Sequence, residues 1–352
     1  MGGVTLSLTR GAEQGTPRLA DIASQAGVSE ATVSRVLNGR PGVATATRRR
    51  VVAALDVLGH ERPVRLRQSS VGLVGLVIPE LTNPIFPAFA QVVEQVLAGY
   101  GYTPVLCTQM PGGSTEDELV EQLEDRGVTG IVFLSGLHAD LTADPVRYHK
   151  LASRRVPFVL VNGYNERITA SFVSSDDRSA VRMAVRHLAD LGHARIGLAV
   201  GPTRFVPSRR KVEGFVAALH SFRRTRAEEA EEYVERTLFT VEGGHAAGAA
   251  LLDKGCTGIV CGSDLMALGV IRAARERGLS VPHDVSVIGF DDSPLIAFTD
   301  PPLTTVRQPV QAMATAAVDA LLEEAGGTPV QRTEFVFQPE LVVRGSTARR
   351  SG

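Results

Sequence analysis

The chain has 352 residues, a formal net charge of −1 and 44% hydrophobic residues. This length exceeds one ordinary domain, and the apolar content is enough for packed cores. No apolar run reaches the length of a membrane span, and no signal-peptide pattern is present, so we expect a soluble, cytoplasmic protein without a membrane partner. Cys107, Cys256 and Cys261 form no CxxC pair, which favours buried thiols over disulfides or metal ligands.

Charge is distributed unevenly along the chain. Residues 1–67 contain ten Arg and five acidic residues, a net of +5, which leaves −6 for the remainder. Residues 1–16 are rich in Gly, Thr and Ser, and we expect them to be disordered. A small basic head on an acidic body is typical of a module that binds phosphate-rich nucleic acid.

Residues 19–38 predict two short helices joined by a tight turn. The first helix has an apolar face made of Leu19, Ile22, Ala23 and Ala26. Gly27 follows, where a left-handed residue can end a helix without steric cost, and Ser29 can cap the second helix. The second helix has an apolar face made of Val33, Val36 and Leu37. This pattern is typical of a helix-turn-helix that enters the DNA major groove, although an ordinary helical hairpin is the alternative.

A third helix is expected over residues 45–58. Its buried stripe is Val51, Ala54, Leu55 and Leu58, and Thr45 or Thr47 could cap it. Arg48, Arg49 and Arg50 lie in its first turns, where they oppose the helix dipole. They are candidate phosphate contacts, and a solvated charged face is the alternative.

From Val71 onward, short apolar runs alternate with amphipathic helices. Ten candidate strands occur between residues 71 and 306, including 236–240 and 303–306. Val- and Ile-rich strands that alternate with helices predict parallel sheets covered on both faces, and this number of strands favours two doubly wound lobes. Ligands in such sheets bind beyond the carboxyl ends of the strands. We therefore expect the small-molecule site in segments 79–86, 162–164, 201–211, 262–264, 290–293 and 306–308.

Several motifs resemble the lactose-repressor/galactose-repressor family. The head segment ADIASQAGVSEATVSRVLN (residues 20–38) is similar to its signature, and the body carries NPIF (83–86), LGHARIG (191–197), GSDLMALG (262–269), VPHDVSVIGFDD (281–292) and PLTTVRQP (302–309). The resemblance covers about residues 17–346. It implies a transcription factor that is a homodimer or a higher oligomer, and whose body resembles periplasmic binding proteins. Its implied partners are duplex operator DNA and a small-molecule effector.

The resemblance also implies a division of the chain. The fold class is a small all-α helix-turn-helix DNA-binding head plus an α/β periplasmic-binding-protein-like body of two doubly wound parallel-sheet lobes. The expected parts are a disordered segment (1–16), a DNA-binding domain (17–62), a short hinge (63–70), an effector-binding and dimerisation body (71–346) and a tail (347–352). Within the body, we expect the N-lobe at about 71–161 and 308–325, and the C-lobe at about 163–306 and 326–346.

In the head, the resemblance assigns DNA contacts to the recognition helix and its cap. These residues are Ser29, Glu30, Ala31, Thr32, Ser34, Arg35 and Asn38, with Arg48 and Arg49 in the third helix. An arginine at position 35 can make a bidentate contact with guanine. Glu30 could accept from a cytosine amino group or help to cap the helix, and both alternatives stay open.

In the cleft, the resemblance implies eight effector-binding residues: Asn83, Phe86, Asn162, Lys211, Phe239, Ser263, Asp291 and Gln308. Acceptors, amides and aromatic rings suit a polyhydroxylated ligand such as a sugar. Lys211, which stands where the family usually has Arg, would also suit a sugar acid or phosphate. No cofactor or metal is implied.

The linker departs from the family pattern. The family's linker helix carries a leucine that enters the minor groove, whereas residues 63–74 are shorter and lack the usual Ala-rich helix. Leu66 is the candidate wedge, flanked by Arg65 and Arg67. Minor-groove insertion is therefore in doubt for this chain.

The expected function is a sugar-responsive repressor that its ligand releases from DNA. Three other functions are alternatives to it. A regulator that binds DNA only with a purine or sugar-phosphate corepressor remains the main alternative. A sugar-binding protein without DNA function would not explain the basic head. An enzyme is not expected, since no GxGxxG, GxxxxGK[ST] or GxSxG motif occurs.

Overall fold

The computed structural model describes residues 18–38, 40, 42–58, 70–109, 112–223 and 226–350. The chain divides into two compact units between Ser70 and Val71. The first unit contains the head and the second contains the body. The expected disordered segment 1–16, and the expected hinge up to residue 69 with Leu66, lie outside the described residues.

The head is built from three helices, α1 (Leu19–Ala26), α2 (Glu30–Leu37) and α3 (Thr45–Val57). Gly27 has a φ of 62° and ends α1, and the Ser29 hydroxyl accepts from the Thr32 amide at the start of α2, as predicted. The core of the head consists of Ile22, Ala23, Ala26, Val33, Val36, Val51, Ala54 and Leu55. Ala44 occupies the N-cap position of α3, so the expected cap at Thr45 or Thr47 is wrong.

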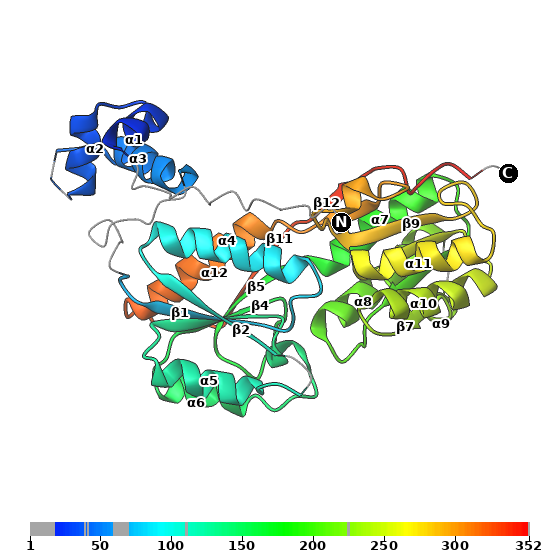
Figure 1. Cartoon of the computed structure of the whole chain (residues 1–352). Helices are drawn as coiled ribbons and strands as arrows, with labels where there is room; N and C mark the ends of the chain where they lie inside the picture. The colour runs from blue at the N-terminus through cyan, green and yellow to red at the C-terminus, as the bar shows by residue number, and fades with distance from the viewer. Residues whose placement is uncertain are drawn as a thin grey trace, which may run out of the picture. The chain divides into compact units, whose positions relative to one another are not determined.

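The body contains two six-stranded sheets. The N-lobe sheet has the order β11-β5-β4-β3-β1-β2, and all its pairs are parallel. Its strands are β1 (Leu73–Ile78), β2 (Thr103–Thr108), β3 (Gly130–Leu134), β4 (Phe158–Val161), β5 (Ser171–Ser175) and β11 (Thr333–Phe337). Helices α4 (Ile85–Gly99) and α12 (Val310–Ala325) pack against one face, and α5 (Glu116–Asp125) and α6 (Val146–Ser153) against the other (Figure 1).

The C-lobe sheet has the order β12-β10-β9-β8-β6-β7, with β12 antiparallel to β10. Its strands are β6 (Ile196–Val200), β7 (Val234–Arg236), β8 (Gly258–Cys261), β9 (Ser286–Asp291), β10 (Thr304–Arg307) and β12 (Glu340–Val342). Helices α7 (Asp177–Asp190), α8 (Val206–Arg223) and α9 (Ala227–Glu231) share one core with this sheet, and α10 (Val241–Asp253) and α11 (Asp264–Glu276) share another (Figure 1). Two short 3₁₀ helices, η2 (Leu137–Ala139) and η3 (Ile296–Phe298), follow β3 and β9.

The central strands are buried along their whole length because helices cover both faces of each sheet. Every residue of β3, β4, β6, β8 and β9 is buried. Cys256 and Cys261 are buried free thiols and Cys107 is half-buried, and burial raises the pKa of Cys256 to about 12. None of the helices in the described part of the chain is long and apolar enough to cross a membrane.

Three details of the expected organisation are wrong. The expected boundaries place β5 and β11 in the C-lobe, but both strands belong to the N-lobe sheet, where β11 pairs with β5. The strand expected at 236–240 ends at Arg236, because Thr240 begins the capping of α10. The expected tail at 347–352 is packed as far as Arg350, whose amide donates to Leu191.

Candidate functional site

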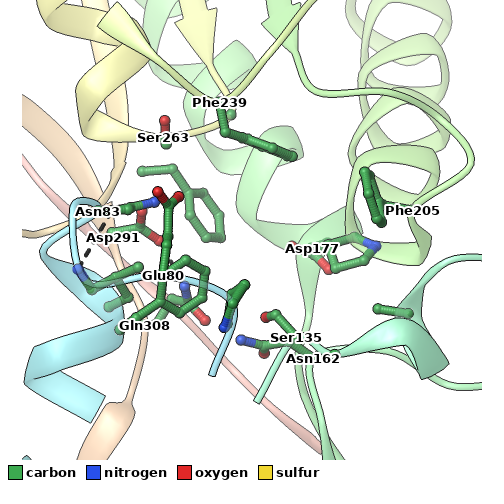
Figure 2. A pocket seen from close by; sticks show the side chains of 18 of the residues that line it. Glu80, Asn83, Ser135, Asn162, Asp177, Phe205, Phe239, Ser263, Asp291 and Gln308 are labelled. Carbon is green, nitrogen blue, oxygen red and sulfur yellow. Dashed lines mark hydrogen bonds between the residues drawn. The ribbon is translucent and has the colours of Figure 1, made fainter. Parts of the chain in front are cut away.

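A cavity of about 300 Å³ lies between the two sheets, a volume within the usual range for small-molecule sites. Its walls come from the carboxyl ends of the strands of both lobes, and the side chains in Figure 2 converge on it. The N-lobe residues are Pro79, Glu80, Asn83, Ile85, Phe86, Gln109, Ser135, Gly136, Leu137, Ala139, Asn162 and Gln308. The C-lobe residues are Asp177, Phe205, Pro207, Lys211, Phe239, Gly262, Ser263, Phe290 and Asp291. We call this cavity the pocket.

All eight residues expected in the cleft line the pocket: Asn83, Phe86, Asn162, Lys211, Phe239, Ser263, Asp291 and Gln308. Four groups of lining residues fell outside the expected segments, and one of them is Phe239, which only the family resemblance had named. Gln109 follows β2, residues 135–139 follow β3, and Asp177 begins α7 after β5. These strands are parallel to their neighbours, so the carboxyl-end rule applied to every strand would have found them.

Lys211 is a buried cation that has its counterion within the pocket. Its ammonium donates to Oδ1 of Asp177 and lies 3.9 Å from the centroid of the Phe290 ring. Burial raises the pKa of Asp177, while Lys211 acts in the opposite direction. The charge of Lys211 is therefore compensated by protein groups before any ligand binds.

Asp291 and Asp264 form a buried acidic pair at the end of β9. Asp291 accepts from Nε2 of Gln308 at 2.7 Å. Asp264 lies behind it and accepts from the Ser293 amide at 2.7 Å and the Thr305 hydroxyl at 2.6 Å. Burial raises the pKa of Asp264 to about 6, and burial together with the charge of Asp264 raises the pKa of Asp291 well above its usual value.

Three lining residues have a left-handed backbone. Ser135, Asn162 and Asp291 have φ values of 49°, 65° and 111°. Non-glycine residues rarely adopt such values, and they concentrate at ligand sites where the surrounding structure holds them. Each of the three ends or follows a strand and turns its side chain out of the sheet into the pocket (Figure 2).

The Phe239 ring forms part of the C-lobe wall, where it lies against two glycines. A Cβ on Gly201 would lie 2.1 Å from this ring, and one on Gly262 would lie 3.4 Å from it. Phe205 lies beside Asp177, on the same lobe (Figure 2). The aromatic wall thus depends on the absence of a side chain at Gly201.

The two lobes also contact each other beside the pocket. Asp140 of the N-lobe forms a β-bridge with Phe205 and accepts from Nε of Arg204 at 2.9 Å. Arg210 on α8 also makes a bidentate ion pair with Glu334 on β11, at 2.6 and 2.9 Å. These contacts hold the lobes together around the pocket.

In the head, the exposed face of α2 is the candidate nucleic-acid interface. Glu30, Ala31 and Arg35 are exposed. The residues beside them bond locally: the hydroxyls of Ser29 and Thr32 share a hydrogen bond, and the Asn38 amide donates to the carbonyl of Ser34 at 2.8 Å. Arg48 is half-exposed on α3, whereas the side chain of Arg49 lies outside the described set.

Two known family models match this chain. Residues 18–62 match bacterial regulatory proteins of the lacI family, and residues 185–347 match a periplasmic binding protein-like domain. An uncharacterized HTH-type transcriptional regulator in the aml 5′ region of Streptomyces limosus is 75% identical to this chain, and the similarity covers 98% of this chain and 99% of the relative.

Solved structures with the same organisation include a transcriptional regulator CelR–cellobiose complex, with a TM-score of 0.68 and 31% identity. The match covers 94% of this chain and 100% of that one. A lac repressor dimer bound to operator and the anti-inducer ONPF has a TM-score of 0.66 and 26% identity, covering 94% and 99% of the two chains. Both the head and the body therefore have counterparts of known structure.

Proposed function

Because this chain belongs to the lacI family of bacterial regulatory proteins, we propose that it represses sugar uptake and catabolism genes as a homodimer on a pseudo-palindromic operator. A neutral sugar in the pocket releases it from DNA. Such a regulator acts on chromosomal DNA, which implies a cytoplasmic location.

The head supports the DNA-binding part of this proposal. Two helices cross at the Gly27 turn, and the exposed face of α2 presents Glu30, Ala31 and Arg35. A helix with this geometry fits the major groove, where an arginine can pair with guanine O6 and N7. We assign base contacts to these residues with Thr32, Ser34 and Asn38, phosphate contacts to Arg48 and Arg49, and a linker contact to Leu66.

The body supports a dimer. Large apolar side chains remain exposed on it, including Leu106 on β2, and Leu295 and Phe298 beside or within η3, and Phe298 is 85% exposed. In the proposed dimer, the second copy of the chain covers the exposed apolar side chains beside and within η3. The similar lac repressor structure contains a dimer on its operator.

We propose a neutral ligand because the charge of Lys211 is already compensated. A sugar phosphate or sugar acid would need a cation that is not already neutralised, but Asp177 holds this one. The remaining groups, the amides of Asn83, Asn162 and Gln308 with the rings of Phe86 and Phe239, suit hydroxyls on a ring with apolar faces. The similar CelR structure contains cellobiose.

A thermal-shift screen of the full-length protein tests the ligand class. The panel contains cellobiose, maltose, ribose, glucose 6-phosphate and hypoxanthine. A neutral sugar at about 100 times its dissociation constant should add about 2.7 kcal/mol of stability. Stabilisation by the phosphate or the purine alone would instead support the corepressor alternative.

The second measurement concerns the sign of the response. An operator is first selected from random duplex DNA by the full-length protein, and its affinity is then measured with and without the stabilising sugar. We expect the sugar to weaken operator binding by about 1–3 kcal/mol of coupling, and the operator to weaken sugar binding by the same factor. Equal or tighter operator binding with sugar would contradict release by the ligand.

A further inference from the structure

A buried carboxylate lies directly behind the pocket in the N-lobe. Glu116 is the first residue of α5, and its side chain is 0% exposed. A carboxylate in such a place costs free energy unless several donors satisfy it. The hydrogen-bond partners of Glu116 therefore indicate the role of this buried carboxylate.

Three residues donate hydrogen bonds to the carboxylate, and the guanidinium of Arg147 lies beside it without a hydrogen bond. Oε2 of Glu116 accepts from Nε2 of Gln109 at 2.5 Å and from the Leu137 amide at 2.9 Å. Oε1 accepts from the Tyr148 hydroxyl at 2.5 Å and lies 3.6 Å from Nη1 of Arg147. Gln109 and Leu137 line the pocket, whereas Tyr148 and Arg147 belong to α6.

The carboxylate is held rigidly. The ring of Tyr148 is 1% exposed and packs edge-on against Phe133, with 5.3 Å between the ring centroids. A Cβ on Gly136 would lie 2.7 Å from Oε2 of Glu116, so the main chain of the loop after β3 closes around the carboxylate. Glu116 is therefore an acceptor whose position is set by packing.

Gln109, by contrast, follows the edge strand β2, none of whose residues is buried. A glutamine side chain in such a place samples many rotamers, and ordering it on ligand binding costs free energy. The bond to Glu116 selects one arrangement before the ligand arrives. A carboxylate only accepts, so Gln109 must turn an N–H towards it, and Oε1 remains as the amide's acceptor for a ligand hydroxyl.

From this arrangement we infer that Glu116 is a positioning residue of the ligand site, which prearranges Gln109 to accept a hydrogen bond from a ligand hydroxyl. The inference rests on the proposed binding of a neutral sugar. It adds a residue that does not line the pocket and a hydrogen-bonding role for Gln109.

The test is a double-mutant cycle on the full-length protein, with cellobiose and maltose titrated by calorimetry. Glu116→Gln keeps the size of the side chain, and Glu121→Gln makes the same change on the exposed face of α5. We expect Glu116→Gln to weaken binding of the sugar about tenfold, and Glu121→Gln to leave it unchanged. In a Gln109→Ala background, Glu116→Gln should weaken binding less than about threefold, because the group through which it acts is gone.

A purely structural role for Glu116 predicts a different result. It would lower the unfolding temperature, and its effect on sugar binding would multiply with that of Gln109→Ala. Independent effects, or equal binding by Glu116→Gln and Glu121→Gln, overturn the inference and leave the proposed function intact. If the wild type binds neither disaccharide nor any other neutral sugar, the proposed function fails and the inference fails with it.

Tyr148→Phe serves as the second variant if Glu116→Gln does not fold. It removes one donor that fixes the carboxylate and keeps the aromatic packing. We expect weaker sugar binding in the same direction, again dependent on Gln109. Unchanged binding by Tyr148→Phe, or an effect that persists fully in the Gln109→Ala background, would count against the positioning role.

Discussion

At the scale of single residues, the pocket has more buried carboxyl groups than cations among its described residues. Asp177, Asp264 and Asp291 are buried in or beside it, and Lys211 is paired with the first of them. Burial raises the pKa of all three carboxyl groups. These carboxyl groups therefore take up protons more readily than solvated ones would. The free energy of unfolding of the body should depend on the ion pair and on pH.

The ion pair gives the first prediction. Lys211→Met leaves the Asp177 carboxylate buried without a counterion, which should destabilise the body by about 3–5 kcal/mol in urea unfolding. Adding Asp177→Asn should restore part of this loss, because the uncompensated charge is then removed. Arg209→Met, at an exposed position of α8, is the matched control and should change stability by less than about 1 kcal/mol. A double variant that is no more stable than Lys211→Met would contradict the pairing.

Asp264 gives a prediction about pH. Its pKa in the folded protein is raised from 3.8 to about 6, so its contribution to stability is present below pH 3.8 and is lost as pH rises through about 6. The Asn side chain of the Asp264→Asn variant does not ionise between pH 4 and pH 7. The stability of the variant relative to the wild type should therefore improve by about 2 kcal/mol between pH 4 and pH 7. Urea unfolding at several pH values measures this, with Asp125→Asn on the surface as control, and a constant difference would refute it.

At the scale of elements, we assign different DNA contacts to α2 and α3. α2 presents Arg35 on its exposed face, whereas Arg48 lies in the first turns of α3. A side chain on the recognition helix reaches base edges, but one on a flanking helix reaches phosphates. The two helices should therefore respond differently to the same substitution.

Arg35→Ala should cost about 1–3 kcal/mol on the selected operator and relax the base preference at one position. Arg48→Ala should weaken all duplex sequences alike and reduce the salt dependence by about one ion. Binding isotherms on operator and random duplexes, at several salt concentrations, separate the two effects. Full base discrimination by Arg35→Ala would show that another residue reads the sequence.

Elements with a strong local pattern could be predicted from the sequence. The three head helices and the buried strands have either a helical apolar stripe or a continuous apolar run, and nine of the ten expected strands overlap observed ones closely. The remaining elements lack such a signal. β7 is a three-residue edge strand, and β11 and β12 are partly exposed edge strands with charged residues.

The pocket could be predicted where a motif ends a strand, as at Asn83 and Asp291. Gln109 was missed because its segment carries no such motif. Glu116 was missed because α5 reads as an acidic, solvated helix. Its position was nevertheless informative, since Glu116 precedes Leu119, Val120 and Leu123 by three, four and seven residues and so lies on their buried face.

At the scale of the whole molecule, the head and body are separate compact units, each with its own core. The body contains both sheets and the complete pocket. Ligand binding should therefore not require the head, whereas the proposed control of DNA binding by the ligand would require both units.

Removal of residues 1–70 tests this division. The remaining body should unfold cooperatively and bind the same sugar within about threefold of the full-length affinity, because no lining residue of the pocket is lost. It should lose all operator binding. Calorimetry and operator titration check the two outcomes, and sequence-specific DNA binding by the isolated body would contradict the role given to the head.

The chain passes from the N-lobe to the C-lobe and back again, which has a consequence for folding during synthesis on the ribosome. The N-lobe begins with β1, but α12 and β11, which complete it, follow the whole stretch from α7 to β10. Until α12 leaves the ribosome, the part of the N-lobe sheet that contains Val132, Val159 and Val173 lacks α12, one of the two helices on that face. The C-lobe then lacks its edge strand β12 and the packed C-terminal segment up to Arg350. The lobe that starts first is therefore completed late, and during that interval its uncovered apolar face is the part of the nascent chain most exposed to aggregation and to chaperones.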